Sequence, residues 1–390
     1  MLKQKNNIFY VITSLDYGGS QKNLYYILKY FPKEYKNYIF EPIVISFKKG
    51  GRFKNRISCL GVKVYDLCLP EKISFLTFFI LPYSIFKFFC LVIKYRPKII
   101  HSFLFQANFL SRFVKFFLPK TKIFCSERVA EKHKLWQLKL LKLSNFLVEK
   151  IFVNSEDLKS YVIKTQKVNQ QKVLVIQNII DLSEIKIKHN EFDIRKQLGI
   201  PEKCFFVLSI GRLERQKGFD LSIEVVKNFN EEIRKHNYDR DYVFVIIGDG
   251  IEYNRLINYA KKLEVEKYIR FLGYKENIYD YINACDLFLL TSYWEGSPNV
   301  VLEALALKRP VISSEVEGIS EFLNKDFIVS LKKDRKSIIE EFVEKILNIY
   351  LIEKGNLDYT LCINKRFNID IYLPNFVVGK FLNHYIDKIS

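Results

Sequence analysis

Two successive series of short apolar strands, separated by helical stretches, constrain this fold more than any other feature of the sequence. In the first half we expect buried strands at Asn7–Thr13, Glu41–Ser46, Lys63–Asp66, Lys98–His101, Lys122–Ser126, Lys150–Asn154 and Lys172–Gln177. A second series runs through Phe205–Ser209, Val243–Gly248, Ile269–Phe271, Leu287–Leu290, Val311–Ser313 and Phe327–Val329. Strands that alternate with helices form parallel βαβ units. The sequence therefore predicts an α/β protein of two doubly wound, Rossmann-like domains.

A charged stretch from Ser183 to Gln197 separates the two series and lacks a strand pattern. We interpret it as the linker, with an N-terminal domain at residues 1–185 and a second domain at 186–366. A chain of 390 residues suits two domains. In such sheets the default ligand site lies outside the carboxyl ends of the strands, here in a cleft between the domains.

Charge and composition exclude several functions. The net charge of +19 favours polyanionic partners. The lysines are spread along the chain, and no zinc-finger, RRM or basic-arm pattern occurs, so we do not expect nucleic acid as a partner. The seven cysteines form no CxxC pair and the five histidines no HExxH motif. We therefore expect reduced thiols and no metal site.

One apolar segment bears on location. Ile73–Ile93 contains a single charge, Lys87, and is long enough to span a bilayer, but Pro82 interrupts it. We favour one or two buried helices over a spanning helix; a helix lying in the membrane interface is the intermediate alternative. Met1–Asn7 is polar and has no secretory signal pattern, so we expect a cytoplasmic protein.

The densest cluster of candidate site residues follows the strand Leu287–Leu290. Ser297 and Pro298 have the pattern of an N-cap and a first-turn proline, which predicts a helix over Asn299–Leu307. The start of such a helix suits a phosphate. Glu295 lies before this helix and Glu303 within it. One of these carboxylates can accept hydrogen bonds from a ribose and the other from a sugar ring. A capped surface helix with two solvated glutamates explains this segment equally well.

A second cluster favours the site interpretation. Arg212 and Lys217 follow the strand Phe205–Ser209, and Gly211 and Gly218 allow the backbone to bend closely around a ligand. Two cations at a strand end can neutralise a departing diphosphate. The alternative, two solvated basic residues, explains their position less well.

Two glycine pairs give weaker signals. Gly248-Asp249-Gly250 predicts a tight turn, but Tyr253 stands where a dinucleotide fingerprint has its third glycine. This disfavours an NAD-dependent oxidoreductase. Gly18-Gly19 follows the first strand, and its N–H groups could contact the same diphosphate from the first domain.

Taken in order, these motifs resemble the retaining family 4 glycosyltransferases, which have the GT-B fold. The resemblance covers nearly the whole chain. The matching motifs are Gly18-Gly19, Val153-Asn154-Ser155, Gln177-Asn178-Ile179-Ile180-Asp181, Gly211-Arg212-Leu213, Lys217-Gly218, Gly248-Asp249-Gly250, Phe271-Leu272-Gly273, Glu295 and Glu303, Pro310-Val311-Ile312, and Gly318-Ile319-Ser320-Glu321. Two segments depart from the family pattern, Leu307-Lys308-Arg309-Pro310 and Asn178-Ile179, and both affect local loop shape.

The resemblance implies roles for these residues. Glu303 would hold the donor ribose, Arg212 and Lys217 the diphosphate, and Glu295 the transferred sugar. The donor pocket would be completed by Gly18, Gly19, Gly211, Gly248, Gly296, Ser297, Pro298, Asn299 and Val300. The leaving phosphate would take the proton of the acceptor hydroxyl, so the reaction would need no enzyme nucleophile, cofactor or metal.

The resemblance also concerns the first domain, which in this family binds the acceptor. Ser126 and Glu127 resemble the Ser-Glu-Arg turn of members that add HexNAc or hexose to bacterial glycans. His101 matches a position that often faces the transferred sugar, and a capping role for it is equally expected. Phe367–Ile389 would be the family's final helix, which returns to the first domain.

The acceptor is expected to be a lipid-linked or surface glycan. Phe109–Leu118 and Lys132–Leu143 mix basic and aromatic residues and, as helices, could contact an anionic membrane. Ordinary amphipathic packing explains them equally well. A nucleotide-sugar donor, with UDP as the expected nucleotide, completes the set of partners.

Two rival functions remain open. One is a GT-B epimerase or hydrolase, but we find no additional carboxylate pair for its acid–base chemistry. The other is a non-catalytic nucleotide-sugar-binding assembly protein, which the presence of both cations and both glutamates disfavours.

Overall fold

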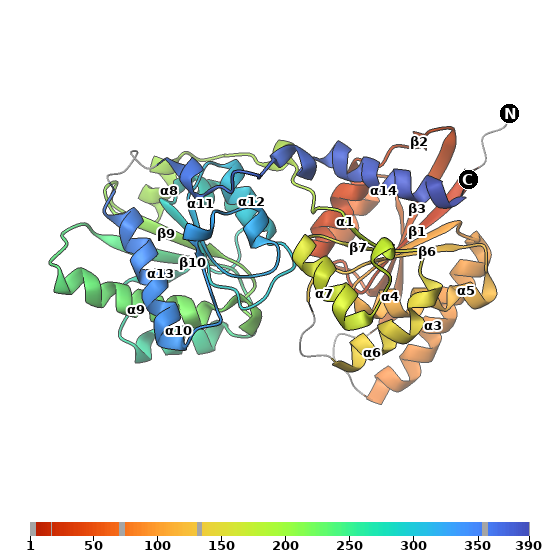
Figure 1. The fold of residues 1–390 in the computed structure, drawn as a ribbon, viewed down its shortest axis with the longest axis horizontal. Helices are drawn as coiled ribbons and strands as arrows, with labels where there is room; N and C mark the ends of the chain where they lie inside the picture. Colours follow the sequence, from red (N-terminus) through yellow and green to blue (C-terminus); the bar gives the residue numbers. More distant parts are fainter. Residues whose placement is uncertain (1–4, 17, 70–74, 131–134, 353–357, 390) are drawn as a thin grey trace. The chain divides into compact units, whose positions relative to one another are not determined.

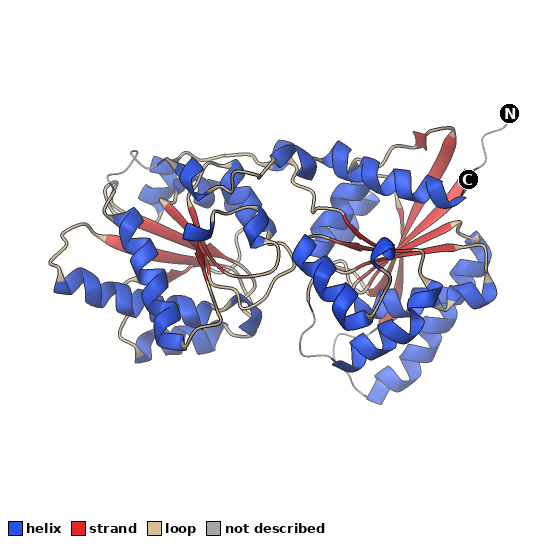
Figure 2. Ribbon diagram, viewed as in Figure 1, coloured by secondary structure: helices blue, strands red, loops and turns tan. Residues whose placement is uncertain are grey.

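The structure, a computed structural model, describes residues 5–16, 18–69, 75–130, 135–352 and 358–389. The chain forms two compact units, one of Met1–Asp181 with Asn368–Ser390 and one of Leu182–Phe367. The divisions lie close to the predicted boundaries after residues 185 and 366. Figure 2 shows helices on both sides of each sheet.

Unit 1 is built on a sheet of order β2-β3-β1-β5-β6-β7-β8, with β4 paired to β3 (Figure 1). Its strands are β1 (Lys5–Ile12), β2 (Glu34–Tyr35), β3 (Tyr38–Lys48), β4 (Lys63–Leu69), β5 (Ile99–Phe103), β6 (Lys122–Ser126), β7 (Lys150–Val153) and β8 (Val173–Val175). The short β2 pairs antiparallel with β3, whereas the other neighbouring strands run parallel. The α/β class with a parallel sheet is therefore confirmed.

The helices of unit 1 cover both faces of this sheet. They are α1 (Gly19–Lys29), α2 (Arg52–Ser58), α3 (Phe75–Tyr95), α4 (Phe105–Arg112), α5 (Val114–Phe117), α6 (Leu135–Ser144), α7 (Glu156–Gln166) and α14 (Pro374–Ile389), with 3-10 turns η1 (Asn145–Leu147), η2 (Gln170–Lys172) and η8 (Ile369–Tyr372). In β1, Ile8 and Tyr10 face one core, which includes α1 and α14, and Phe9 and Val11 face the other. Alternate residues of a strand point to opposite faces, so a strand that is apolar throughout is buried on both.

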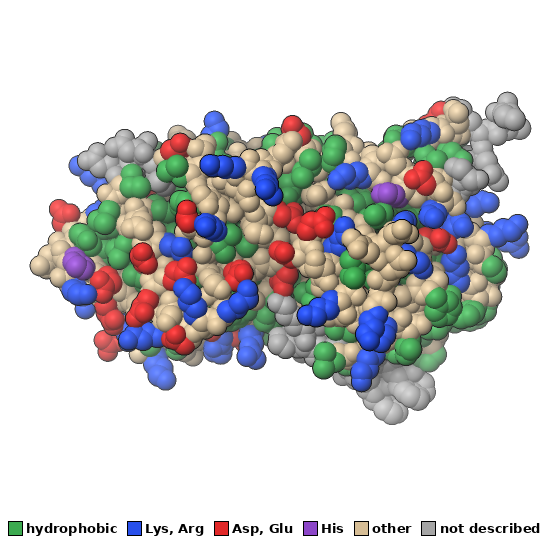
Figure 3. All heavy atoms as spheres, in the orientation of Figure 1, with side chains coloured by type: hydrophobic (Ala, Val, Ile, Leu, Met, Phe, Trp, Pro, Cys, Tyr) green, Lys and Arg blue, Asp and Glu red, His purple; other side chains and the backbone are tan. Residues whose placement is uncertain are grey.

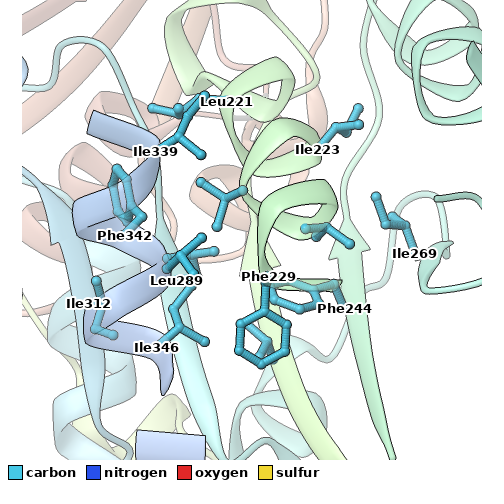
Figure 4. Packing of buried hydrophobic residues seen from close by; sticks show 14 of the residues in the cluster. Leu221, Ile223, Phe229, Phe244, Ile269, Leu289, Ile312, Ile339, Phe342 and Ile346 are labelled. Carbon is cyan, nitrogen blue, oxygen red and sulfur yellow. The ribbon is translucent and has the colours of Figure 1, made fainter. Parts of the chain in front are cut away.

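Unit 2 repeats this plan with the order β11-β10-β9-β12-β13-β14. Its strands are β9 (Phe205–Ile210), β10 (Tyr242–Ile247), β11 (Ile269–Phe271), β12 (Leu287–Leu290), β13 (Val311–Ser314) and β14 (Ile328–Val329). Its helices are α8 (Glu191–Gln197), α9 (Phe219–Lys235), α10 (Tyr253–Lys262), α11 (Ile278–Ala284), α12 (Asn299–Ala306) and α13 (Arg335–Tyr350), with 3-10 turns η3 (Leu182–Glu184), η4 (Arg215–Lys217), η5 (Ile319–Glu321), η6 (Lys325–Phe327) and η7 (Tyr359–Cys362). Figure 4 shows α9 and α13 packing Phe229 and Phe342 onto this sheet.

Two predicted segments need correction. The charged stretch 183–197 is not wholly a linker, because its second half is α8, capped by Asn190, which accepts a hydrogen bond from Asp193 N. Arg195 of α8 is buried and pairs with Asp286 at 2.8 Å, and this long-range contact has no local sequence signal. At the C-terminus the predicted helix 367–389 is split into η8 and α14, because Pro374 starts a new helix.

In the apolar segment 73–93, residues 73 and 74 lie outside the described residues, and the rest belongs to one helix, α3, which contains Pro82. One helix agrees with the favoured interpretation, but its full burial does not. Ser84, Phe88 and Val92 are buried, whereas Tyr83 and Phe86 are exposed, so one side of α3 packs on the unit and the other faces outwards. Among the described residues no helix is long and apolar enough to cross a membrane.

Candidate functional site

The candidate site in unit 2 lies where β9 and β12 end. These strands are parallel neighbours, so the loops 211–218 and 291–298 leave the sheet at the same edge. Hydrogen bonds join the loops: Tyr293 N donates to Gln216 O at 2.8 Å, and Gln216 Nε2 donates to Trp294 O at 2.9 Å. The two clusters that the sequence singled out are therefore one structural feature.

Two glycines permit close backbone contacts at this edge of the sheet. Gly218 has φ +61°, and a Cβ placed there would lie 2.1 Å from Thr291 O. At Gly248 a Cβ would lie 1.8 Å from Gly211 O. A side chain at either position would push the neighbouring loop away.

Lys217 and Glu295 meet at the centre of these loops. Lys217 Nζ lies 2.5 Å from Glu295 Oε1, and both side chains are largely buried. Ser292 Oγ also donates to Glu295 Oε1, at 2.9 Å. A cation and a carboxylate that share a buried position each offset the desolvation cost of the other. The pair presents both charge types at one sheet edge.

Arg212 and Glu303 are placed differently. Arg212 lies on the same loop as Lys217, but its half-exposed guanidinium contacts Glu214 Oε1 at 2.9 Å. Glu303 lies in α12 and is buried, with 5% of its surface exposed. The structure therefore brings Lys217 and Glu295 together, places Arg212 on the loop of Lys217 and places Glu303 on the helix that follows the loop of Glu295.

The start of α12 corrects one prediction. The capping position is occupied by Pro298, not Ser297, and the helix begins at Asn299. Pro298 has an extended backbone and no side-chain acceptor, so it cannot cap the helix as a serine would. Gly296, Ser297 and Pro298 are buried, and Asn299 and Val300 form the half-buried first turn.

A charged cluster next to this site was missed by sequence reasoning. Arg335 of α13 contacts Tyr293 Oη at 2.6 Å, Asp220 at 3.1 Å and Glu224 at 2.7 Å. Burial raises the pKa of Tyr293 to about 12, so its hydroxyl stays protonated and donates to Asp220. The cluster ties the loop before Glu295 to α9 and α13. Arg335 lies far from these partners in sequence, and no local pattern marks it.

Gln216 and Ser292 were also missed as site residues. Both contact Glu295, Gln216 Nε2 at 3.5 Å and Ser292 Oγ at 2.9 Å. Gln216 directly precedes Lys217, and Ser292 lies three residues before Glu295, so proximity in sequence was the available signal. Glu317 Oε2 accepts from Glu295 N at 3.4 Å and comes from a separate loop.

In unit 1, the predicted glycines lie at the start of α1. Gly18 occupies its capping position with extended backbone, and Gly19 is its first residue. A Cβ on Gly18 would lie 2.4 Å from Gln21 Oε1. The helix start follows the carboxyl end of β1, which is the sheet edge where ligands of doubly wound folds bind.

His101 lies in the core of unit 1. Its Nδ1 is 2.5 Å from Tyr385 Oη, and its Nε2 is 2.8 Å from Ser126 Oγ. Burial, with a smaller effect of Arg128, lowers the pKa of His101 well below its usual value, so the imidazole is neutral. A fully buried ring with both nitrogens engaged argues against the predicted catalytic role. Ser126 is buried in the same chain of contacts.

Glu127 lies one residue beyond β6. Its two carboxylate oxygens accept from Gln166 Nε2 at 2.9 and 2.7 Å. Burial raises the pKa of this carboxyl, while Gln166 and Arg112 lower it. Glu127 is thus held by α7 at the carboxyl edge of the unit 1 sheet.

Within the parts of the chain that the structure describes, no group of three or more His, Cys, Asp or Glu side chains could hold a metal ion. The described cysteines are free thiols.

Comparison with known proteins adds to this geometry. Residues 190–358 match the model of the family glycosyl transferases group 1. The chain is 33% identical over 208 residues to an Escherichia coli UDP-Gal:alpha-D-GlcNAc-diphosphoundecaprenol alpha-1,3-galactosyltransferase, covering 51% of this chain and 52% of that one. It is 25% identical over 254 residues to a Campylobacter jejuni N-acetylgalactosamine-N,N'-diacetylbacillosaminyl-diphospho-undecaprenol 4-alpha-N-acetylgalactosaminyltransferase, covering 63% and 65%. These matches span about half to two thirds of the relatives.

Solved structures resemble the whole chain. Anabaena Alr3699/HepE in complex with UDP and glucose has a TM-score of 0.78 at 18% identity, covering 98% of this chain and 100% of that one. WaaG, a glycosyltransferase involved in lipopolysaccharide biosynthesis, has a TM-score of 0.67 at 15% identity, covering 96% and 99%. These likenesses show a shared fold.

Proposed function

We propose that the protein is a glycosyltransferase, because residues 190–358 match the family glycosyl transferases group 1 and the chain has the GT-B fold. It would move a hexose or HexNAc from a nucleotide-diphosphate sugar to a glycan acceptor, with retention of the anomeric configuration. The observation that carries the proposal is the Lys217–Glu295 pair at the end of β9 and β12. A cation for the diphosphate and a carboxylate for the sugar hydroxyls are adjacent there.

The donor side follows from this arrangement. Lys217 and Arg212 would neutralise the diphosphate, with the start of α12 contributing backbone N–H groups. Glu303 would accept hydrogen bonds from the ribose and Glu295 from the transferred sugar. Gly211, Gly218 and Gly248 would let the backbone approach the donor. Because two side-chain cations serve the diphosphate, we expect no metal cofactor.

The reaction would then need no enzyme nucleophile. The bond from the sugar C1 to the diphosphate oxygen breaks, and a bond from C1 to the acceptor oxygen forms on the same face. The acceptor hydroxyl gives its proton to the leaving phosphate oxygen. Lys217 stabilises the charge that grows on that phosphate.

The donor base and the acceptor rest on the relatives. The Escherichia coli relative is named for UDP-Gal, and HepE was solved with UDP and glucose, so UDP is the favoured nucleotide of the donor. Both named relatives carry a diphosphoundecaprenol acceptor in their names. We accordingly favour a lipid-linked acceptor, used at the cytoplasmic face of a membrane, with unit 1 on the acceptor side.

Product analysis tests this function. The protein is incubated with UDP-hexoses and UDP-HexNAcs, with and without a polyprenyl-diphosphate-linked sugar, and products are identified by NMR. Transfer that requires the acceptor and yields UDP supports the proposal. A free sugar or an epimerised donor formed without acceptor would instead indicate a hydrolase or epimerase. Donor binding by the wild type with no product in either incubation would favour a non-catalytic binding protein.

A further inference from the structure

Exposed apolar side chains are concentrated in one region of unit 1. More than half of the large hydrophobic residues that are exposed in the described parts of the chain lie between Leu81 and Phe146. Several are exposed over most of their surface, such as Phe86 (66%), Leu143 (72%) and Phe146 (73%). Single exposed apolar residues are ordinary, but a concentration of them indicates a binding surface.

Helix α3 contributes the first part of this surface. Its inner side is buried through Ser84, Phe88 and Val92. Its outer side carries Tyr83, Phe86 and Ile93, which are three to four residues apart or multiples of that spacing, and so lie on one face of the helix. An apolar outer face is the reverse of the pattern expected of a helix that covers a sheet and faces water.

Helix α6 contributes the second part. Leu135, Trp136, Lys139, Lys142 and Leu143 form its exposed face. Leu138 and Leu141 on the other side are buried, so α6 carries apolar residues on both faces. The exposed face combines a tryptophan, leucines and lysines, which is the composition of helices that lie in a membrane interface.

Aromatic contacts join these helices into one surface. The rings of Phe89 in α3 and Phe117 in α5 lie 4.9 Å apart, and those of Phe105 in α4 and Trp136 in α6 lie 5.3 Å apart. Figure 1 shows α3, α4, α5 and α6 on the same side of unit 1. We call the exposed residues of α3, α5, α6 and η1 the α3–α6 face.

The charge of the α3–α6 face is of one sign. The sequence has no Asp or Glu from Lys72 to Ser126, and none from Lys132 to Val148. Lys94, Lys139 and Lys142 are exposed on α3 and α6. In Figure 3, hydrophobic and basic side chains lie next to one another over this part of unit 1.

We propose that the α3–α6 face docks onto the surface of an anionic lipid bilayer, with α3 and α6 lying in the interface rather than spanning it. Phe86, Phe116 and Leu143 would enter the headgroup region, and Lys139 and Lys142 would extend to anionic headgroups. Docking would bring unit 1 to a lipid-linked acceptor, and only this purpose rests on the proposed function; the docking itself does not depend on it.

Charge favours this occupant over a second copy of the chain. Two copies joined through the α3–α6 face would place two uniformly basic surfaces against each other, which costs free energy. Anionic lipid supplies the opposite charge, and each lysine near such a surface adds to the attraction.

Co-sedimentation with vesicles tests the proposal. The full chain is mixed with vesicles of phosphatidylcholine alone, or with roughly one third phosphatidylglycerol. We expect binding to the anionic vesicles that weakens as salt rises from about 0.05 M to about 0.5 M. A triple variant, Phe86→Ser, Phe116→Ser and Leu143→Ser, should lower the apparent affinity by about tenfold or more.

Matched variants in unit 2 serve as controls. Phe192→Ser, Ile251→Ser and Leu361→Ser change three apolar residues that are also exposed over more than half of their surface, and they should leave vesicle binding unchanged. Lys139→Glu with Lys142→Glu should weaken binding to anionic vesicles, and Lys261→Glu with Lys262→Glu, which alters net charge equally, should weaken it much less. Circular dichroism confirms folding of each variant.

Three results would overturn the proposal. The first is that the wild type does not bind anionic vesicles at low salt. The second is that the two triple variants lose vesicle binding equally. The third is that light scattering shows a dimer of the wild type and a monomer of the α3–α6 triple variant alone. UDP binding by the α3–α6 triple variant should equal that of the wild type. Failure of the docking surface is therefore distinguishable from failure of the proposed function.

Discussion

At the scale of single residues, Glu295 is the group whose charge matters most for the proposed site. It accepts from Lys217, Ser292 and Gln216, so its position is fixed by three partners. In the proposed site Glu295 would contact the transferred sugar and Lys217 the diphosphate. Substitution of Glu295 should therefore separate UDP binding from turnover.

We predict that Glu295→Gln lowers kcat by about 100-fold while UDP binding is kept. Glutamine keeps the shape and one acceptor oxygen, but it loses the charge that attracts the sugar hydroxyls and any positive charge at C1. Steady-state kinetics and a UDP titration measure the two effects. Glu315→Gln, which changes a carboxylate paired with Lys332, is the control and should alter neither by more than about twofold. Equal kcat values for the wild type and Glu295→Gln would refute the role.

His101 supplies a prediction about pH. Its pKa is lowered by burial in the folded protein, so below the usual value near 6.5 the unfolded chain takes up a proton that the folded chain does not. The free energy of unfolding therefore keeps its full value above about pH 6.5. As the pH is lowered from there, it falls by up to about 1.4 kcal/mol per pH unit. Urea unfolding from pH 7.5 to pH 5.5 measures this slope.

The variant His101→Gln should flatten that slope. His384 also has a lowered pKa, but it is present in both proteins, and its contribution cancels in the comparison. Identical slopes for the two proteins would show that His101 is not held neutral by the core.

The roles of these residues differ in how far the sequence could predict them. The Lys217–Glu295 contact could be predicted from the sequence, because each residue follows a strand and neighbouring parallel strands end at one edge. The contacts of Arg335 could not be predicted, since its partners Asp220 and Glu224 lie on another helix. The burial of His101 could not be predicted either, because it depends on Tyr385 of α14, which packs on the sheet only in the folded unit.

At the scale of elements, the turn at Gly218 joins the two loops of the site. Its backbone has positive φ, and Thr291 O occupies the space that a side chain would need. Thr291 Oγ1 also donates to Gly218 O at 2.9 Å. The turn and the strand end are therefore packed as one piece.

Gly218→Ala should destabilise the protein by at least about 2 kcal/mol more than Gly199→Ala. Gly199 also has positive φ, at +58°, but a Cβ there would meet nothing within 4 Å. The control therefore carries the backbone strain, roughly 1 kcal/mol, without the collision. Urea unfolding monitored by circular dichroism measures both. Equal losses would mean that the close approach of Thr291 does not constrain the turn.

Element boundaries were predictable where buried strands defined them. β6, β11 and β12 have the bounds that their apolar runs predicted. The start of α12 at Asn299 was also predicted, but its cap was not, because Pro298 rather than Ser297 occupies the capping position. Helix α8 was missed, since it lies within a stretch that looked like a linker and its buried Arg195 pairs with Asp286, far away in the sequence.

At the scale of the whole molecule, the C-terminus of the chain completes unit 1. Six residues of α14 are buried in its core: Val377, Val378, Phe381, Leu382, Tyr385 and Ile386. At about 2 kcal/mol for each side chain, their burial contributes on the order of 10 kcal/mol. This is comparable to the net stability of a whole domain.

Deletion of residues 374–390 should therefore unfold unit 1 and leave unit 2 folded. Hydrogen exchange followed by mass spectrometry should show lost protection in β1 and β5 and retained protection in β9 and β10. Loss of protection in both units would contradict the division at Asp181 and Phe367, and retained protection in β1 and β5 would contradict the role of α14.

The α/β architecture was predictable from the sequence because strands buried on both faces leave continuous apolar runs. The exposed outer side of α3 was not, since an apolar helix has the same local pattern whether it faces a core or a membrane. Only packing against the sheet through Ser84, Phe88 and Val92 shows which side is left outside.

Nucleotide binding at the Lys217 loop of unit 2 is the central property of the proposed site. Calorimetric titration of UDP into the wild type, Lys217→Gln and Arg215→Gln tests it directly, because Arg215 is an exposed base in the same turn. We predict that Lys217→Gln weakens the affinity about 10- to 100-fold and that Arg215→Gln changes it less than about twofold. Equal affinities for the wild type and Lys217→Gln would contradict the assignment of this site.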